Sequence, residues 1–150
     1  GSEMCIRDRD TLTIPVIVNE KMEYGIYSYK RMTPYEEAKS TLATYQASYD
    51  AAEEELKKAT IQSRMDDCSI RMYDISDSCL NEIWNLVKYN TSEEKFNEIL
   101  TEQRKWIADK EAAGNEILDQ NDGSSAQMDS SLKMAELTME RCEELADYLK

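Results

Sequence analysis

Residues 126–149 read AQMDSSLKMAELTMERCEELADYL, and apolar side chains recur in this segment every three or four positions. That spacing places the apolar side chains on one face of an α-helix and leaves the charged ones on the opposite face. The segment therefore predicts an amphipathic helix that needs a partner to cover its apolar face. The residues on that face are Met128, Leu132, Ala135, Met139, Cys142, Leu145 and Leu149.

A similar pattern begins at Thr33, far upstream. Thr33 is a good N-cap residue, Pro34 follows at the first helical position, and Glu36 completes a capping-box spacing with Thr33. This signal predicts that a long helix starts here and continues to about residue 65. Its apolar face comprises Tyr35, Ala38, Leu42, Tyr45, Tyr49, Ala52, Leu56 and Ala59.

Two more amphipathic segments lie between these. We predict one helix over about Ser69–Tyr89, with Asp66-Asp67 as the break before it, and another after the turn at residues 90–94. Trp84 and Trp106 fall on the apolar faces of these helices, so we expect both in the core. Truncating a core Trp106 to alanine would cost about 3–5 kcal/mol. The second of these helices carries Phe96, Ile99, Leu100, Gln103, Trp106, Ile107, Ala113 and Ile117 on one face.

The connections between these helices are short, which makes successive helices antiparallel. The predicted fold is all-α, an antiparallel bundle of about four helices with a short extended N-terminal arm. No internal repeat is convincing, which argues against a solenoid. Residues 10–32 form the arm, because they are rich in β-branched and aromatic side chains, 33–65 the long N-terminal helix, and 66–150 a helical domain.

Residues 1–9 are excluded from this interpretation. Gly1-Ser2 looks like a cloning scar, and Glu3–Arg9 resembles a string that recurs in proteins translated from metagenomic reads that contain adapter DNA. We therefore expect that an export signal has been lost from this end.

Composition narrows the class of function. The 150 residues carry a formal net charge of -13, and phosphate binding needs basic surface, so a nucleic-acid partner is not expected. The sequence contains no run of about 18 apolar residues, so no membrane span is predicted. The negative charge favours a cationic protein partner, or serves solubility alone.

Motifs of catalysis are missing from the sequence. The chain has no histidine, which removes the commonest general base and the commonest transition-metal ligand. It has neither a Gly-rich phosphate loop after a strand nor a G-x-S-x-G elbow. We therefore expect no enzyme, no cofactor and no metal.

The cysteines Cys68 and Cys79 admit two interpretations. On one straight helix, eleven residues apart, they would be separated by roughly 16 Å, too far for a disulfide. A bridge between them therefore requires a bend, and Cys68 directly after Asp66-Asp67 is placed to lie in one. Without a bend both are reduced, half-buried thiols of a cytosolic protein. Cys142 lies on the apolar face of the last helix, where we expect a small buried thiol.

Residues 67–149 contain three short blocks: Asp67-Cys68 followed by Cys79, LTEQRKWI at 100–107, and LTMERCEEL at 137–145. Together these blocks resemble the lysozyme inhibitor LprI family, specifically its amino-terminal helical domain. The first block is similar to the family's opening cysteine pair, the second to Leu-x-x-Ala-Gln-Arg-x-Trp and the third to Leu-Thr-x-x-Arg-x-x-x-Leu. The matching residues, which we expect to define the fold, are Leu100, Gln103, Arg104, Trp106, Leu137, Thr138, Arg141 and Leu145.

One departure from the family pattern concerns its other two cysteines. In this sequence, Gly114 and Lys133 are found near the positions where the family has its other two cysteines. The loss of one whole disulfide would remove both of these cysteines together. The resemblance then leaves Cys68 and Cys79 as the remaining candidate bridge.

The resemblance implies an exported bacterial protein, secreted or attached to the cell envelope, that inhibits lysozyme. An acidic domain would be steered toward a basic lysozyme, which is the partner we expect. We expect the loop at 121–125 to enter the sugar cleft of the lysozyme. The alternative interpretation is that this loop is an ordinary connection between two helices. Its residues are Asn121, Asp122, Gly123, Ser124 and Ser125.

Two alternatives stay open. One is a structural or interaction module of the cell envelope without inhibitory activity. The other is a cytosolic helical interaction protein, for which the family resemblance would be accidental.

Overall fold

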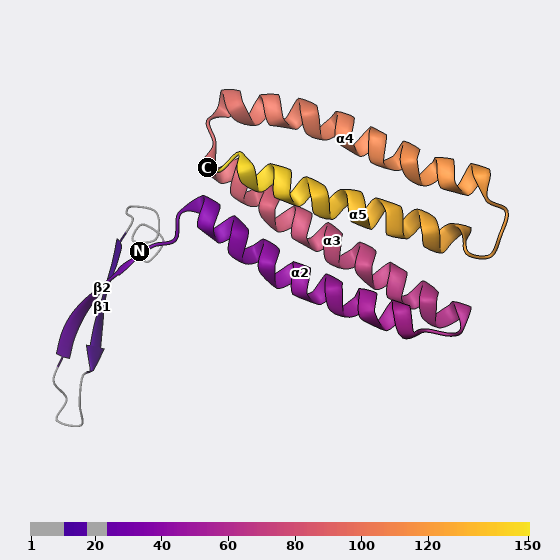
Figure 1. Cartoon of the computed structure of the whole chain (residues 1–150). Coiled ribbons are helices and arrows are strands. Elements are labelled where there is room, and N and C mark those ends of the chain that lie inside the picture. The colour runs from indigo at the N-terminus through magenta and orange to yellow at the C-terminus, as the bar shows by residue number, and fades with distance from the viewer. Residues whose placement is uncertain (1–10, 18–23) are drawn as a thin grey trace.

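The structure, a computed structural model, describes residues 11–17 and 24–150. In that part of the chain, four long helices follow a two-stranded hairpin (Figure 1). The predicted all-α bundle is confirmed. The elements are β1 (Thr11–Ile17), β2 (Tyr24–Lys30), α2 (Pro34–Lys58), α3 (Gln62–Asn90), α4 (Glu93–Gln120) and α5 (Ala126–Asp147).

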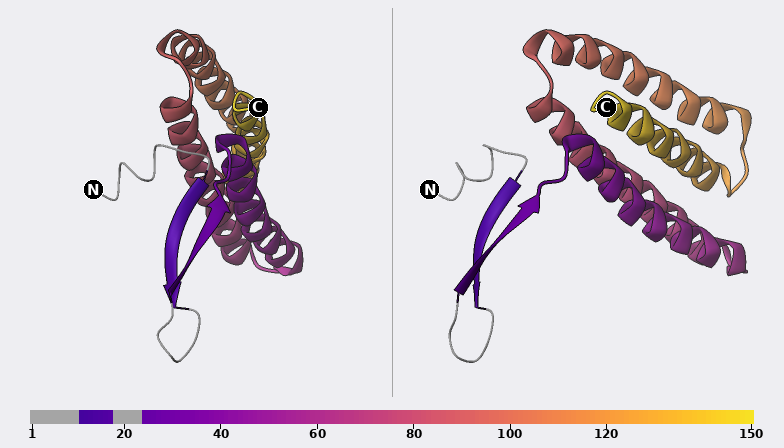
Figure 2. Two further views of the ribbon diagram at one scale, coloured as in Figure 1. Left: turned by 90° about the vertical axis from the view of Figure 1, so that its left-hand side faces the viewer. Right: turned by 60° about the vertical axis from the view of Figure 1, so that its left-hand side comes forward.

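Successive helices run antiparallel, so α3 and α5 run parallel to each other (Figure 1). The most extensive packing is between α3 and α5, followed by that between α2 and α3. These three helices form the tight part of the bundle. Helix α4 packs along α5 and touches α3 little, so it lies to one side of the other helices (Figures 1 and 2).

The core lies where α2, α3 and α5 meet. Ile83, Val87 and Cys79 of α3 and Leu145 and Cys142 of α5 are fully buried. Burial of this apolar surface is the main stabilising contribution to the fold, because each helix alone exposes an apolar face. Helix α2 contributes Ala38, Leu42, Tyr49 and Ala52, and α4 contributes Ile99.

Helix starts follow the capping signals in two places. The Thr33 hydroxyl accepts a hydrogen bond of 3.1 Å from the Glu36 amide, as its sequence predicts. Ser92 caps α4 in the same way, accepting from the Lys95 amide at 3.2 Å. Both caps satisfy backbone donors that the first turn of a helix leaves unpaired.

The predicted boundary between the first two helices is wrong. Helix α2 ends at Lys58, well before residue 65, and α3 begins at Gln62 and runs through Asp66 and Asp67 without a break. The turn lies at the intervening residues, where Ala59 has an extended backbone. Both aspartates lie beyond the first turn of α3, and the Gln62 side-chain amide donates a hydrogen bond of 2.8 Å to Asp66 four residues along the helix.

The N-terminal arm is an antiparallel hairpin in which Thr11 pairs with Lys30 and Ile17 with Tyr24. Pro15 lies within β1, opposite Ile26. A two-stranded sheet consists of edge strands only, and an edge strand accommodates a proline that lacks an amide donor. The hairpin extends away from the amino-terminal start of α2 (Figure 2). The interpretation of residues 1–9 lies outside the described residues.

Candidate functional site

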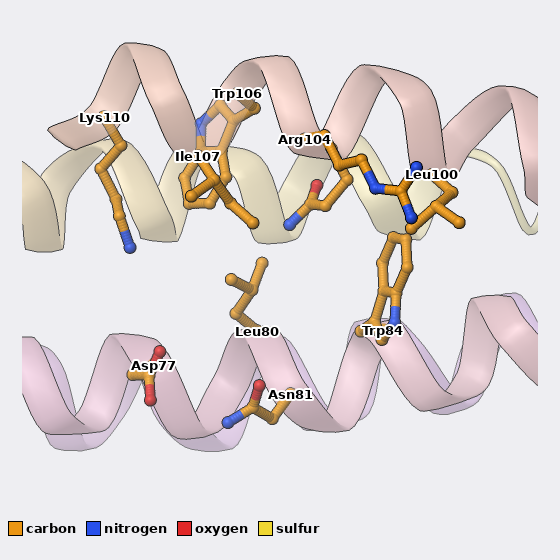
Figure 3. Close-up of a pocket in the computed structure, with 10 residues that line it drawn as sticks. Asp77, Leu80, Asn81, Trp84, Leu100, Arg104, Trp106, Ile107 and Lys110 are labelled. Carbon is orange, nitrogen blue, oxygen red and sulfur yellow. The ribbon is translucent and has the colours of Figure 1, made fainter. Parts of the chain in front are cut away.

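A groove of about 420 Å³ runs between α3 and α4 (Figure 3). It exists because α4 is held by α5 and not by α3, so the facing sides of α3 and α4 do not close on each other. The groove is lined by Asp77, Leu80, Asn81 and Trp84 from α3 and by Leu100, Gln103, Arg104, Trp106, Ile107 and Lys110 from α4.

The two tryptophans line this groove and are only half-buried, which corrects the expectation that both lie in the core. Trp84 contacts Phe96 with ring centroids 5.1 Å apart. Ile107, predicted on the inward face of α4, is 40% exposed. Helical spacing identifies an apolar face, but it cannot tell a face that is covered by a neighbour from one that borders a groove.

Lys110 is the charged side chain most deeply placed in the groove, at 9% exposed. Its ammonium lies 5.1 Å from the centroid of the Trp106 ring on α4 and 5.7 Å from that of Tyr73 on α3. Among the described residues, no carboxylate lies within ion-pair distance of Lys110, so the two rings supply its electrostatic contacts. The groove thus combines aromatic walls with a cation, a lining suited to binding another molecule.

Gln103 has a different role from its neighbours in the groove. It is 6% exposed, and its Oε1 accepts a hydrogen bond of 2.7 Å from Nε of Arg141 on α5. Nη1 of Arg141 also lies 2.9 Å from Glu144. The hydrogen bond between Arg141 and Gln103 therefore links the sequence block 100–107 on α4 to the block 137–145 on α5. The Thr138 hydroxyl, on the same helix as Arg141, donates to the Met134 carbonyl of its own helix.

A sequence profile described as "Lysozyme inhibitor LprI" matches residues 57–145. The match covers more than half of the chain and contains both linked blocks. The chain belongs to the lysozyme inhibitor LprI family. No curated protein and no solved structure matches the chain.

The remaining LprI block residues differ in burial. Leu145 is fully buried and Thr138 nearly so, Leu100 and Leu137 are half-buried, and Arg104 is exposed at the groove. Their contacts place Leu145 and Thr138 in the packing of α5. Arg104 and Leu100 face a surface that a partner can reach.

Gly114 lies at a close contact between α4 and α5 in this LprI chain. A Cβ on Gly114 would lie 2.7 Å from the sulfur of Met134, and the Gly114 carbonyl accepts a hydrogen bond of 2.9 Å from Ser130. Met134 follows Lys133 in the chain. Lys133 and Gly114 are the two positions near which the family has its other cysteines. The two helices are therefore in contact where the family pattern places its second cysteine pair.

The LprI loop at 121–125 lies at the tip of the α4–α5 hairpin, beyond the groove. The Asn121 carboxamide oxygen accepts from the Gly123 amide at 2.9 Å, and the Ala126 amide donates to the Gly123 carbonyl at 3.1 Å. Asp122, Gly123 and Ser124 are exposed. These bonds give the loop a defined shape and leave its side chains available for contact.

The candidate bridge between Cys68 and Cys79 is absent from the structure. Both lie on the uninterrupted helix α3 and both are free, because the bend that such a bridge requires does not exist. Eleven residues of helix separate their Cα atoms by roughly 16 Å, far beyond disulfide reach. Cys79 interacts instead with Cys142 of α5, whose thiol lowers the pKa of Cys79, and both residues belong to the same core cluster.

None of the described helices is long and apolar enough to span a membrane. In the same part of the chain, no three histidine, cysteine, aspartate or glutamate side chains gather as metal ligands would. The family is named for inhibition, and membership is compatible with a protein that is not an enzyme.

Proposed function

We propose that this LprI family protein is an exported helical protein that binds a lysozyme and inhibits it. The observation that carries the proposal is the family match, which spans three helices and the end of a fourth. Secretion or attachment to the cell envelope follows as part of the same proposal, since lysozymes act on the cell wall.

Charge supports a basic lysozyme as the partner. The chain carries a formal net charge of -13. Opposite net charges accelerate encounter and orient the two proteins before they touch. This attraction is screened at physiological salt, so it explains the choice of partner better than it explains tight binding.

Inhibition requires that a convex element enter or cover the lysozyme's sugar cleft. The loop at 121–125 has the required shape, because it is the narrow connection at the end of a helical hairpin (Figure 1). Asp119 and Asp122 are exposed there and would meet a basic surface. We propose that this loop makes the blocking contact.

The groove between α3 and α4 favours a second candidate function, a structural module of the cell envelope. A concave groove receives a partner's side chains and cannot itself plug a concave cleft. Its tryptophans and Arg104 are residue types that dominate binding energy at protein interfaces. A module of this kind would hold its partner without inhibiting any enzyme.

Inhibition of a basic lysozyme, measured at low and at physiological salt, tests the first function. The loop variant Asp122→Arg and the groove variant Ile107→Glu separate the two surfaces. Asp74→Arg is the matched control for Asp122→Arg, because Asp74 is exposed on α3 and the change in net charge is the same.

The proposal predicts inhibition at physiological salt that is lost in Asp122→Arg and kept in Asp74→Arg and Ile107→Glu. Equal losses in the two arginine variants would show a nonspecific charge effect. Inhibition no stronger than that of an unrelated acidic protein would leave the envelope module as the function.

A further inference from the structure

The contact between Cys79 and Cys142 joins two helices that are distant in sequence. Cys79 lies on α3, Cys142 on α5, and each thiol is 0% exposed. The two residues belong to one core cluster at the interface with the most extensive packing in the molecule.

The register of α3 and α5 places these two positions at similar heights along the bundle. The helices run parallel, and near their start the Gln62 side-chain amide lies 3.8 Å from the Met128 sulfur. Cys79 is seventeen residues beyond Gln62, and Cys142 is fourteen residues beyond Met128. Both helices rise by the same amount per residue, so the heights of the two cysteines differ by less than about one helical turn.

We propose that Cys79 and Cys142 form a disulfide that joins α3 to α5 when the protein folds in an oxidising compartment. The pair differs from the one that the family resemblance suggested. It leaves Cys68 as a free thiol, located 3.9 Å from the Arg71 guanidinium on its own helix.

The chemistry requires an external disulfide, either that of a thiol oxidoreductase or oxidised glutathione. The thiolate of one cysteine attacks this disulfide, forms a mixed disulfide and releases one carrier thiolate. The second cysteine, as a thiolate, then displaces the other carrier sulfur. The two cysteines lose two electrons and two protons, and the carrier disulfide gains them as two thiols.

Burial determines when the reaction takes place. Both thiols are fully buried, so a protein or glutathione disulfide cannot reach them in the closed bundle. The mixed disulfide must form before α5 has docked on α3, and the second step then accompanies docking. The completed bridge encloses all of α4 in a covalent loop, which reduces the conformational entropy of the unfolded chain.

Peptide mapping tests the bridge on the whole chain. The reduced, unfolded protein is refolded with oxidised glutathione, its free thiols are alkylated, and it is digested with trypsin without reduction. Cleavage after arginine and lysine places the four cysteines in separate peptides, residues 1–7, 65–71, 72–88 and 142–150.

The expected product joins peptide 72–88 to peptide 142–150, with 65–71 recovered alkylated. The Cys68→Ser variant should give the same product, and oxidation should raise its Tm by several degrees over the reduced form. Cys142→Ser should show neither effect. A link between 65–71 and 72–88, or alkylation of both Cys79 and Cys142, overturns the proposal. The result does not depend on whether the protein inhibits a lysozyme.

Discussion

Arg141 on α5 donates a hydrogen bond of 2.7 Å from Nε to Oε1 of Gln103 on α4, and both side chains are buried. This contact links the two sequence blocks that carry the family resemblance. It also holds α4 on α5 beside the groove, which Gln103 itself helps to line. The position of the groove wall therefore depends on a polar contact as well as on apolar packing.

We expect Gln103→Leu to lower the free energy of unfolding by about 2 kcal/mol, because it removes a hydrogen bond to a buried charged group. Chemical denaturation measures the change. Gln120→Leu, at an exposed position of the same helix, is the control and should cost less than about 0.5 kcal/mol. If Gln103→Leu costs as much in an Arg141→Met background as in the native chain, the two side chains are not coupled.

Trp106→Ala should lower the free energy of unfolding by about 2 kcal/mol. This is less than the loss of about 3–5 kcal/mol expected when a tryptophan in the core is truncated. The reason is that Trp106 is half-buried at the groove and stacks partly on Lys110. Ile83→Ala is the comparison, because Ile83 is fully buried in α3 and should lose about 3–4 kcal/mol. A larger loss from Trp106 than from Ile83 would contradict the position of Trp106 at the groove.

Gly114→Leu should destabilise the protein by about 1–3 kcal/mol through overpacking at the α4–α5 contact. Even a Cβ at this position would lie 2.7 Å from the Met134 sulfur, so the Met134 side chain or the spacing of the two helices must shift. Ala112→Leu, at an exposed position of α4, controls for the change in helix propensity. Met134→Ala should recover part of the loss in the Gly114→Leu background, and Tm measurements of the four proteins test this.

Alkaline pH should destabilise the bundle through two tyrosines. The Tyr45 hydroxyl donates a hydrogen bond of 2.6 Å to Glu82, which raises the pKa of Tyr45 to about 12. Burial raises the pKa of Tyr49 to about 12 as well. The folded protein keeps these protons longer than the unfolded chain does, so their stabilisation is complete below about pH 10 and is lost between pH 10 and 12.

Denaturant unfolding at several pH values measures this effect. Tyr45→Phe should reduce the loss of stability between pH 10 and 12. Tyr89→Phe, whose ring is 75% exposed, should leave it unchanged. An identical pH dependence in the Tyr45→Phe variant and the native chain would contradict the role of the contact between Tyr45 and Glu82.

The sequence alone determined the helices and their apolar faces. A helix is a local structure, and the signals at Thr33 and in residues 126–149 act within a few residues of themselves. The family could also be recognised from the sequence, because its blocks are short and their order is linear. The break predicted at Asp66-Asp67 was wrong because aspartates do not by themselves end a helix, and Gln62 donates a hydrogen bond to Asp66 within α3.

Only the tertiary structure decided which faces meet. The apolar positions of α4 gave no sign that Trp106 and Ile107 would border a groove, because periodicity does not say how many neighbours a helix has. The sequence likewise grouped Cys68 with Cys79, which are near in the chain, whereas the parallel packing of α3 and α5 brings Cys79 to Cys142. Contacts between helices depend on register and on loop geometry over sixty residues or more, and no local pattern encodes them.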